Sequence, residues 1–600
     1  MPIDFRNTNT VWASVLAETL QRLGLTTAVI CPGSRSAPLT IAFAQNNKIE
    51  TIPILDERSA SFFALGIAQK SGLPAALICT SGTAAANFYP AIIEARESRI
   101  PLLIFTADRP PELRDCHAGQ AIDQVKIYGN YPNWQAELAI PSASIGMLDY
   151  LRQTIVYAIE RSIFPTKGPV HLNIPFRDPL VPVPDIAVEA LETQFNPEHF
   201  FAGLEPTFAG ESSTPPSPPL LRGGEESTMQ QWHKCSKGII IAGVSQPQFA
   251  EKYCSAIAQI SKSLNWPVLA EGLSPVRNYA QLNPHLISTY DLILRNRFLA
   301  DKLTPEIAIQ IGDLPTSKEL RNWLDKTQPK RYIIDPSHHN FDPLHGKTIH
   351  LRTSVENLAT ILTLVPPLTK GGLGGVLTSP SNEYLQLWRN TEIQVRETID
   401  QKISAINKII EPKVSWLLSQ ILPPATPIFI ANSMPVRDVE FFWKPNNLEI
   451  KPFFNRGANG IDGTLSTALG VAHRNQSSIM LTGDLALLHD TNGFLIKNKF
   501  VGHLTIILIN NNGGGIFEML PVAKFDPPFE EFFATPQHIN FAQLCATYGV
   551  EHEVIEDWEQ FKQKLISLPN SGIRVLEVQT DRRSDAKWRQ DNLTKIAKGW

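Results

Sequence analysis

Two stretches stand out in the last part of the sequence: Ile479-Met-Leu-Thr-Gly-Asp-Leu485 and Ile509-Asn-Asn-Asn-Gly-Gly-Gly-Ile-Phe517. In the first, a short apolar run ends in Gly483-Asp484. The second begins where the apolar run 504–509 ends and continues with three asparagines and three glycines. The chain between the runs is long enough for one crossover helix, which predicts two neighbouring strands of a parallel sheet. Ligands bind such sheets at the carboxyl ends of the strands. One carboxylate, one amide oxygen and a free backbone carbonyl in the glycine turn make an all-oxygen set, which suits Mg²⁺ that carries a diphosphate.

A plainer interpretation of the two runs stays open at this point. Asp and Asn are common turn residues, so Asp484 and Asn510 also fit two ordinary strand-to-turn junctions of an α/β domain. The rest of the chain has to decide between a cofactor site and ordinary turns.

Length and composition exclude several classes of protein. Six hundred residues predict roughly three or four domains, and 43% apolar with 19% charged residues is ordinary for globular cores. The net charge of −4 comes without a basic stripe, which argues against nucleic acid as a partner. The six cysteines form no CxxC pair, which favours buried thiols of a reducing compartment. No apolar run approaches a membrane span and no signal peptide is visible, so we expect a soluble, cytoplasmic protein.

The amino-terminal part repeats one pattern, an apolar strand followed by a polar tip and a helix. Strands are predicted at 28–31, 52–55, 75–79 and 102–106. Their tips are Pro32-Gly-Ser-Arg-Ser36, Asp56-Glu-Arg58, Thr80-Ser-Gly-Thr-Ala84 and Ala107-Asp-Arg-Pro-Pro111. This repetition predicts a doubly wound parallel sheet with the polar tips along one edge.

The whole chain divides into three such α/β units, each with a mainly parallel, doubly wound sheet. We expect domains at 1–187, 237–365 and 381–600, separated by a Pro/Ser/Gly-rich linker at 188–236 and a Pro/Gly-rich linker at 366–380. A short Pro-Gly element occurs twice, at 218–224 and 366–375, which indicates inserted sequence in tolerant surface linkers.

The pair Gly483-Asp484, followed after 25 residues by Asn510-Asn511, resembles the signature of thiamine diphosphate (ThDP) enzymes. Leu485 stands where the third residue of the signature is usually Gly, a departure seen in some branches. The resemblance implies the three-domain architecture of the ThDP decarboxylases and carboligases. The first unit would be the pyrimidine-binding domain, the second a central α/β domain, and the third the diphosphate-binding domain. It also implies the cofactors ThDP and Mg²⁺, with Mn²⁺ as an alternative ion.

Glu57 is the candidate catalytic residue. In ThDP enzymes of this architecture the first domain supplies a glutamate that bonds N1′ of the aminopyrimidine and starts the proton relay at the thiazolium carbon. On local grounds Glu57 also fits a helix-starting glutamate beside Arg58, which the helix dipole favours. A ThDP motif in the same chain favours the catalytic interpretation.

Further cofactor contacts follow from the resemblance. Thr80, Gly82, Thr83 and Asn87 would form the pyrimidine-side turn, although Gly82 also fits a plain left-handed turn. Ile461 is positioned as the wedge that bends the cofactor, with a core isoleucine as the alternative. The resemblance assigns the metal to Asp484, Asn511 and the Gly513 carbonyl, and the remaining cofactor contacts to Ser433, Gly483, Leu485 and Ile516.

Basic residues at strand tips or in adjacent loops indicate a substrate with several carboxylates, because an arginine fork binds a carboxylate bidentately. Any one of them alone would more often be a surface charge. The set comprises Arg35, Arg109, Arg437 and Arg456, together with Lys318 in the loop 312–318.

The motifs as a set resemble the carboligases of menaquinone biosynthesis, the 2-succinyl-5-enolpyruvyl-6-hydroxy-3-cyclohexene-1-carboxylate (SEPHCHC) synthase family. The likeness spans the first and third units, but in the middle unit it is confined to the Lys318 loop, where Glu319 replaces a second basic residue. Besides the tips above, it rests on Thr106-Ala-Asp-Arg-Pro-Pro-Glu-Leu113, Gln120-Ala-Ile122, Asn432-Ser433 with Arg437, Asn455-Arg-Gly-Ala458, Gly460-Ile-Asp-Gly463 and Asn510-Asn-Asn-Gly-Gly514.

This resemblance implies decarboxylation of 2-oxoglutarate on the cofactor and 1,4-addition of the resulting carbanion to isochorismate, a step of menaquinone or phylloquinone synthesis. Substrate contacts would come from Ser34, Arg35, Arg109, Gln120, Lys318, Ser433, Arg437 and Arg456. Ile516, Phe517 and Leu520 would form an apolar wall against water. The first and third domains of one chain are expected not to meet, so that the site lies between two chains of a homodimer or homotetramer.

Two other functions remain as alternatives. The first is another ThDP-dependent 2-oxoacid carboligase or decarboxylase, similar to acetolactate synthase. Decarboxylases commonly carry adjacent histidines in the first domain, whereas the adjacent pair His338-His339 lies in the middle unit. The second alternative is a non-catalytic protein with a ThDP fold, against which the intact Glu57, Asp484 and Asn511 argue.

Overall fold

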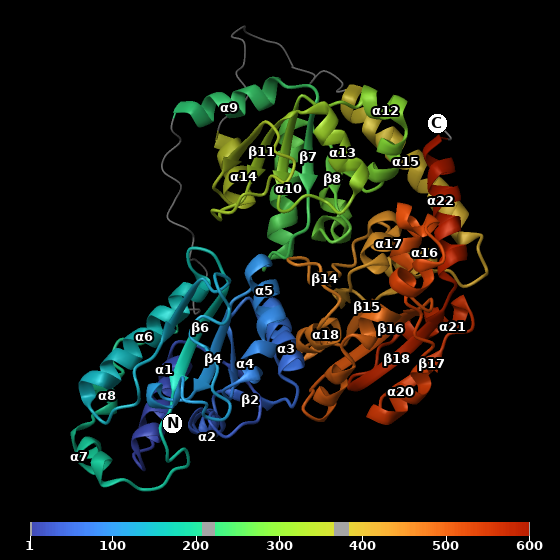
Figure 1. Ribbon diagram of the computed structural model, residues 1–600. Helices are drawn as coiled ribbons and strands as arrows, with labels where there is room; N and C mark the ends of the chain where they lie inside the picture. The colour runs from blue at the N-terminus through green and yellow to red at the C-terminus, as the bar shows by residue number, and fades with distance from the viewer. Residues whose placement is uncertain (1–2, 207–222, 365–382, 599–600) are drawn as a thin grey trace.

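The computed structural model describes residues 3–206, 223–364 and 383–598, and Figure 1 shows them as three α/β units. The first unit, blue to cyan, lies beside the third, orange to red, and the middle unit, green to yellow, lies above both in this view. The Pro-Gly segment 366–375 and residues 218–222 of its counterpart, predicted to be linker sequence, lie outside the described residues.

The first unit is built on a six-stranded parallel sheet in the order β2-β1-β3-β4-β6-β5. Its strands are β1 Thr27–Ile30, β2 Glu50–Pro53, β3 Ala75–Cys79, β4 Leu102–Asp108, β5 Trp134–Glu137 and β6 Pro169–Pro175. Its helices are α1 Thr8–Arg22, α2 Ala37–Gln45, α3 Glu57–Ser71, α4 Thr83–Asn87, α5 Tyr89–Glu97, α6 Ile145–Ile163, α7 Ile186–Gln194 and α8 Pro197–Phe200. Apolar clusters cover both faces of this sheet, which explains why its central strands are continuous apolar runs.

The middle unit has a parallel sheet in the order β12-β11-β10-β7-β8-β9. Its strands are β7 Gly238–Ala242, β8 Val268–Ala270, β9 Leu286–Ile287, β10 Ile307–Ile311, β11 Lys330–Ile334 and β12 Thr348–Leu351. Its helices are α9 Gly223–Lys234, α10 Ala250–Leu264, α11 Tyr290–Arg295, α12 Arg297–Lys302, α13 Lys318–Thr327 and α14 Val355–Leu364. Helix α15, Glu383–Ser404, follows in sequence and packs Trp388 and Val395 into the same apolar cluster as Ile239 and Tyr290.

The third unit repeats the architecture with strand order β14-β13-β15-β16-β18-β17. Its strands are β13 Pro427–Ile430, β14 Lys451–Phe453, β15 Ser478–Gly483, β16 His503–Asn510, β17 Glu551–Val554 and β18 Gly572–Gln579. Its helices are α16 Glu411–Ile421, α17 Met434–Phe442, α18 Thr464–Ala472, α19 Asp484–Leu488, α20 Phe541–Tyr548, α21 Trp558–Ile566 and α22 Arg582–Lys598. The predicted fold class, three doubly wound units with parallel sheets, is confirmed.

The first and third units pack against each other through α3 and α18, which lie side by side in Figure 1. A Cβ added to Gly66 would lie 2.1 Å from the Thr467 carbonyl oxygen, and one added to Gly470 would lie 2.1 Å from the Phe63 carbonyl oxygen. The two helices therefore touch backbone to backbone and bury one common apolar cluster. The expectation that these two units of one chain do not meet is wrong, because small residues on both helices allow close contact.

Among the helices of residues 3–206, 223–364 and 383–598, none is both long enough and apolar enough to cross a membrane.

Candidate active site

A cavity of about 470 Å³ opens at the carboxyl edge of the third sheet. Residues that follow the ends of four neighbouring strands line it, and Thr316 and Arg321 of the middle unit close one side. Among the residues predicted for the site, those that line the cavity are Ser433, Arg437, Arg456, Ile461, Gly483, Asp484, Leu485, Asn511, Gly513, Ile516 and Phe517. Strand tips up to 80 residues apart in sequence thus share one wall, as the parallel order of β14, β13, β15 and β16 requires.

Asp484 and Gly513 join the tips of β15 and β16. The Asp484 carboxylate is buried; Oδ2 accepts a hydrogen bond of 2.7 Å from the Gly513 N–H, and Oδ1 accepts one of 2.8 Å from the Leu485 N–H. Gly513 has φ +138°, and a Cβ there would lie 2.4 Å from the Ala534 carbonyl oxygen, so only glycine fits the turn. Burial raises the pKa of Asp484 to about 6.

Asn511 has the features of a cation ligand. Its Nδ2 donates to Glu411 Oε1 at 2.6 Å, while its buried Oδ1 has no hydrogen-bond partner among the described residues. The Gly513 carbonyl accepts one bond, of 2.9 Å from the Gly515 N–H, which leaves its second lone pair. An unpartnered amide oxygen, a buried carboxylate and a carbonyl fit a hard divalent cation such as Mg²⁺. The described residues contain no cluster of three His, Cys, Asp or Glu ligands, so this fit rests on the mixed oxygen set.

A buried charge cluster lies beneath Asn511, and no sequence motif indicated it. Arg589 of α22 donates to Glu411 Oε2 at 2.5 Å and to both oxygens of Asp438, at 2.5 and 2.8 Å. Asp585 accepts the Glu411 N–H at 3.1 Å. Burial raises the pKa of Asp438 to about 6 and that of Asp585 to about 7. The partners lie more than 150 residues apart in sequence, so periodicity and local spacing carry no signal for them.

Two arginines form the basic side of the cavity. Arg437 donates to the Ser433 carbonyl at 2.6 Å, and Arg456 donates to Asn432 Oδ1 at 2.7 Å and to Thr316 Oγ1 at 3.3 Å. The buried Nε of Arg456 finds no partner in the described part of the chain. Burial, with Arg456 nearby, lowers the pKa of Arg437. Two adjacent guanidinium groups with a free donor suit a carboxylate ligand.

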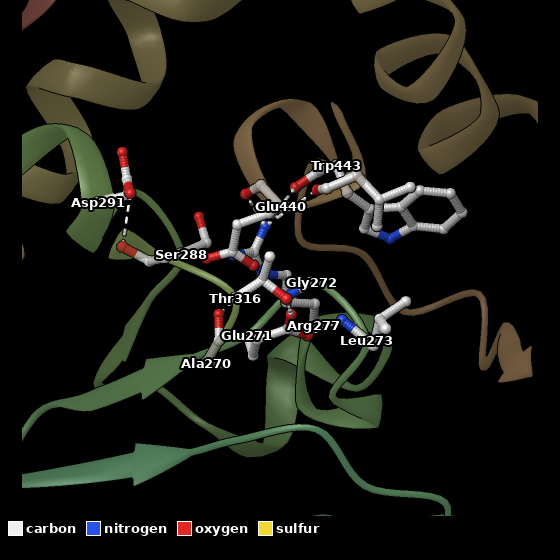
Figure 2. Close-up of polar contacts among 12 residues, drawn as sticks. Ala270, Glu271, Gly272, Leu273, Arg277, Ser288, Asp291, Thr316, Glu440 and Trp443 are labelled. Carbon is white, nitrogen blue, oxygen red and sulfur yellow. Dashed lines mark hydrogen bonds and ion pairs between the residues drawn. The ribbon is translucent and has the colours of Figure 1, made fainter. Parts of the chain in front are cut away.

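The middle unit holds Arg456 through a hydroxyl. Thr316 Oγ1 donates to Glu271 Oε1 at 3.0 Å, so its lone pair is free to accept from Arg456. Figure 2 shows Thr316 beside Glu271, with Arg277 and Glu440 next to them, where the middle and third units meet. Arg277 is fully buried and pairs with Glu440 at 3.2 Å, and burial raises the pKa of Glu440 to about 8. This buried contact fixes the middle unit against the cavity.

A second group of predicted residues gathers at the carboxyl edge of the first sheet. Thr80 Oγ1 accepts the Arg35 N–H at 3.2 Å, and the Arg35 side chain donates to the Phe176 carbonyl at 2.8 Å. Burial, followed by the charge of Arg109, lowers the pKa of Arg35. Gln120 lies over Gly82, because a Cβ added to Gly82 would be 3.4 Å from Gln120 Cβ. Several buried and half-buried polar groups of the first unit therefore lie together at this edge, apart from the cavity of the third unit.

Within one chain, the predicted residues divide into those that line the cavity and those that do not. Those that do not line the cavity are Ser34, Arg35, Glu57, Thr80, Gly82, Thr83, Asn87, Arg109, Gln120, Lys318 and Leu520. Glu57 is half-buried as the first residue of α3, and Ser34 and Asn87 are exposed. Lys318 is exposed at the start of α13, whereas Thr316 of the same loop reaches the cavity.

Comparisons with known proteins agree with this geometry. Three family models match: "Thiamine pyrophosphate enzyme, N-terminal TPP binding domain" at residues 11–127, "Middle domain of thiamine pyrophosphate" at 222–430 and "Thiamine pyrophosphate enzyme, C-terminal TPP binding domain" at 447–578. A relative from Trichormus variabilis named 2-succinyl-5-enolpyruvyl-6-hydroxy-3-cyclohexene-1-carboxylate synthase is 64% identical and covers 100% of this chain and 99% of the relative. A relative of the same name from Trichodesmium erythraeum is 64% identical over 99% of both chains.

The chain belongs to the SEPHCHC synthase family of ThDP enzymes. The resemblance inferred from the motifs is therefore confirmed. Among solved structures, the Rhodococcus jostii ThDP-dependent 4-hydroxybenzoylformate decarboxylase matches with a TM-score of 0.67 at 16% identity, covering 95% of this chain and 99% of that one. The SEPHCHC synthase family thus shares its three-domain fold with a decarboxylase of different sequence.

Proposed function

We propose that this chain is a ThDP- and Mg²⁺-dependent carboligase that decarboxylates 2-oxoglutarate and adds the resulting carbanion to isochorismate in a 1,4 fashion. The product would be SEPHCHC, an intermediate of menaquinone or phylloquinone synthesis. The observation that carries the proposal is one cavity lined both by an oxygen-ligand set, Asp484 with Asn511, and by two half-buried arginines, Arg437 and Arg456. Both substrates are dicarboxylates, so they need such paired cations near the cofactor.

Bound ThDP supplies an acidic thiazolium carbon and an electron sink for decarboxylation. Asp484, Asn511 and the Gly513 carbonyl would hold Mg²⁺, or Mn²⁺, at the diphosphate. Ile461 would support the bend between the cofactor rings, and Ser433, Gly483, Leu485 and Ile516 would provide the remaining contacts from this unit. The position of these residues on the cavity wall supports the assignment.

The substrate side combines charge with exclusion of water. Arg456 would bind a substrate carboxylate through its unpartnered Nε, and Arg437 with Ser433 would bind a second polar group. Ile516 and Phe517 line the cavity and, with Leu520, would keep water from protonating the carbanion. Lys318 would reach the same substrate from the middle unit.

A second copy of the chain would complete the site. The described cavity is lined by the middle and third units alone, while the first-unit residues form a separate edge with exposed Leu55 beside Glu57. Within one chain the start of α3 is already bound to another part of the third unit, because Arg58 donates to the His489 carbonyl at 2.7 Å. We therefore place the first sheet of one subunit over the cavity of another, in a homodimer or homotetramer.

In that arrangement the first unit of the second subunit contributes the proton relay. Glu57 would hold and move a proton at N1′ of the aminopyrimidine. Thr80, Gly82, Thr83 and Asn87 would surround that ring. Ser34, Arg35, Arg109 and Gln120 would face the substrates; the buried, unpartnered Nε of Arg35 within the described residues supports this role.

The proposal is tested by the release of CO₂ from 2-oxoglutarate with and without isochorismate, and with pyruvate in place of 2-oxoglutarate. We expect rapid turnover with 2-oxoglutarate and isochorismate together and formation of SEPHCHC. Turnover of pyruvate without turnover of 2-oxoglutarate would instead indicate an acetolactate-synthase-like enzyme. Failure of ThDP and Mg²⁺ to bind in calorimetry would remove the enzymatic interpretation altogether.

A further inference from the structure

Glu411, the first residue of α16, is almost completely buried and lines the floor of the cavity. Its Oε1 accepts from Asn511 Nδ2 at 2.6 Å and from Thr580 Oγ1 at 3.3 Å. Its Oε2 accepts from Arg589 Nη2 at 2.5 Å, and Arg589 is held in turn by Asp438. Donors from three different segments therefore fix both oxygens of this carboxylate.

An ionised carboxylate accepts hydrogen bonds and donates none, whereas an amide has a donating and an accepting end. Contact with Glu411 therefore selects one of the two amide orientations of Asn511, with Nδ2 toward Glu411 and Oδ1 away from it. The nitrogen end is also confined by the backbone, since a Cβ added to Gly515 would lie 2.7 Å from Asn511 Nδ2. The opposite orientation would set two acceptors against each other in a buried place, which costs about 1–3 kcal/mol in typical proteins.

The selected orientation leaves Oδ1 as a buried oxygen without a partner among the described residues, on the wall that also carries Asp484 and Gly513. No residue in the described ranges donates to this oxygen, while the Asp484 carboxylate and the Gly513 turn lie at the same strand tips. A neighbour that orients a ligand in this way typically accounts for about 10–100-fold in metal affinity.

We propose that Glu411 is a positioning residue for the divalent cation, which turns the Asn511 carbonyl oxygen toward the metal position by accepting the amide protons. The inference rests on the proposed function for the existence of that metal site. It extends the site to a residue that acts on the cation through Asn511. Arg589 supports this role because it holds Oε2 of Glu411, the oxygen that does not contact Asn511.

The test measures Mn²⁺ binding to the full-length protein in the presence of ThDP, from the electron paramagnetic resonance signal of free Mn²⁺. The variant Glu411→Gln keeps the shape of the side chain but adds a donor that competes for the Asn511 oxygen. We expect its Mn²⁺ affinity to fall about 10–100-fold. The matched control is Glu440→Gln, another buried glutamate bonded to an arginine, shown in Figure 2, whose described contacts do not include Asn511. The Mn²⁺ affinity of this control should stay within about twofold of wild type, a much smaller change than the loss of an orienting partner causes.

Exchanging donor and acceptor between positions 411 and 511 distinguishes a positioning role of Glu411 from simple neutralisation of the Arg589 charge. Asn511→Asp alone would set a carboxylate against Glu411, so affinity should fall although a carboxylate is ordinarily a strong Mn²⁺ ligand. The combined variant Glu411→Gln with Asn511→Asp restores a donor facing an acceptor, and its affinity should exceed that of either single variant. A Glu411 that merely neutralised Arg589 would make the combined variant no better than the weaker single one.

Each outcome decides a different point. Two results would overturn the positioning role while leaving the metal site in place. One is wild-type Mn²⁺ affinity in Glu411→Gln, and the other is a combined variant whose Mn²⁺ affinity does not exceed that of each single variant. Absence of Mn²⁺ binding to the wild-type protein with ThDP would overturn the metal site itself, and the inference with it. Asn511→Asp leaves the Arg589 ion pair intact, so it remains decisive where Glu411→Gln does not fold, and a gain of affinity in it would refute the proposal.

Discussion

Replacement of Thr316 by valine removes the hydroxyl that joins Arg456 of the third unit to Glu271 of the middle unit. Thr316 Oγ1 lies 3.0 Å from Glu271 Oε1 and 3.3 Å from Arg456 Nη2, so one substitution breaks two bonds to charged groups. Arg456 then keeps its bond to Asn432 Oδ1, at 2.7 Å, and can rotate about it. The proposed carboxylate contact of Arg456 would lose its fixed direction.

The magnitude follows from the kind of bond that is lost. A hydrogen bond to a charged group contributes about 1.5–3 kcal/mol, and each 1.36 kcal/mol of transition-state stabilisation is tenfold in rate. The contact to Arg456 is long at 3.3 Å, so we take the lower value. Steady-state kinetics should then show a fall of about tenfold in kcat/KM for the substrate bound by Arg456.

The matched control is Thr316→Ser, which keeps the hydroxyl and removes a methyl group. Its kcat/KM should stay within about twofold of wild type, because both hydrogen bonds of the hydroxyl are kept. Equal losses in the serine and valine variants would show that packing, and not the hydrogen bond, matters at this position. A valine variant with wild-type kcat/KM would refute the argument that the middle unit orients Arg456.

Three further predictions concern the relay, the domain contact and the metal. Glu57→Gln should retain ThDP binding in calorimetry but lose about 10²–10⁴-fold in turnover, and full activity would exclude the proton relay. Gly470→Ala should destabilise the protein by about 1–3 kcal/mol in thermal unfolding, because its Cβ would lie 2.1 Å from the Phe63 carbonyl oxygen, whereas Gly146→Ala, with nothing within 4 Å, should not. Burial raises the pKa of Asp484 to about 6, so protons compete with the cation below that value. Mn²⁺ affinity should therefore fall as pH drops below about 6 and stay level above it; the opposite slope would contradict this assignment.

Local features of the sequence determined the sheets and the glycine turn that carries the proposed metal ligands. The apolar run 75–79 coincides with β3, since a strand that is buried on both faces of a sheet consists of consecutive apolar residues. The turn after β16 is also local, because Gly513 requires a positive φ and closes on Asp484 at the neighbouring strand tip. Motif spacing was sufficient here because consecutive strands of a doubly wound sheet align their carboxyl ends.

The contact between the first and third units was decided by tertiary packing. Gly66 and Gly470 look like ordinary helix glycines in sequence, and their fit depends on how α3 and α18 cross. The family resemblance predicted that these units stay apart, and the structure shows a shared apolar cluster instead. A crossing of two helices depends on the register of both, which neither helix encodes alone.

The neighbours that orient the site residues were likewise decided by the fold. Glu411 lies 100 residues from Asn511, and Arg589 lies 178 residues from Glu411. Hydrogen bonds nevertheless connect these three buried residues, with Glu411 in the middle. Sequence indicated Lys318 as the contribution of the middle unit, whereas Thr316, two residues earlier, lines the cavity. Strand tips can be read from local patterns, but the partner of a buried charge depends on which helices the finished fold brings over the sheet.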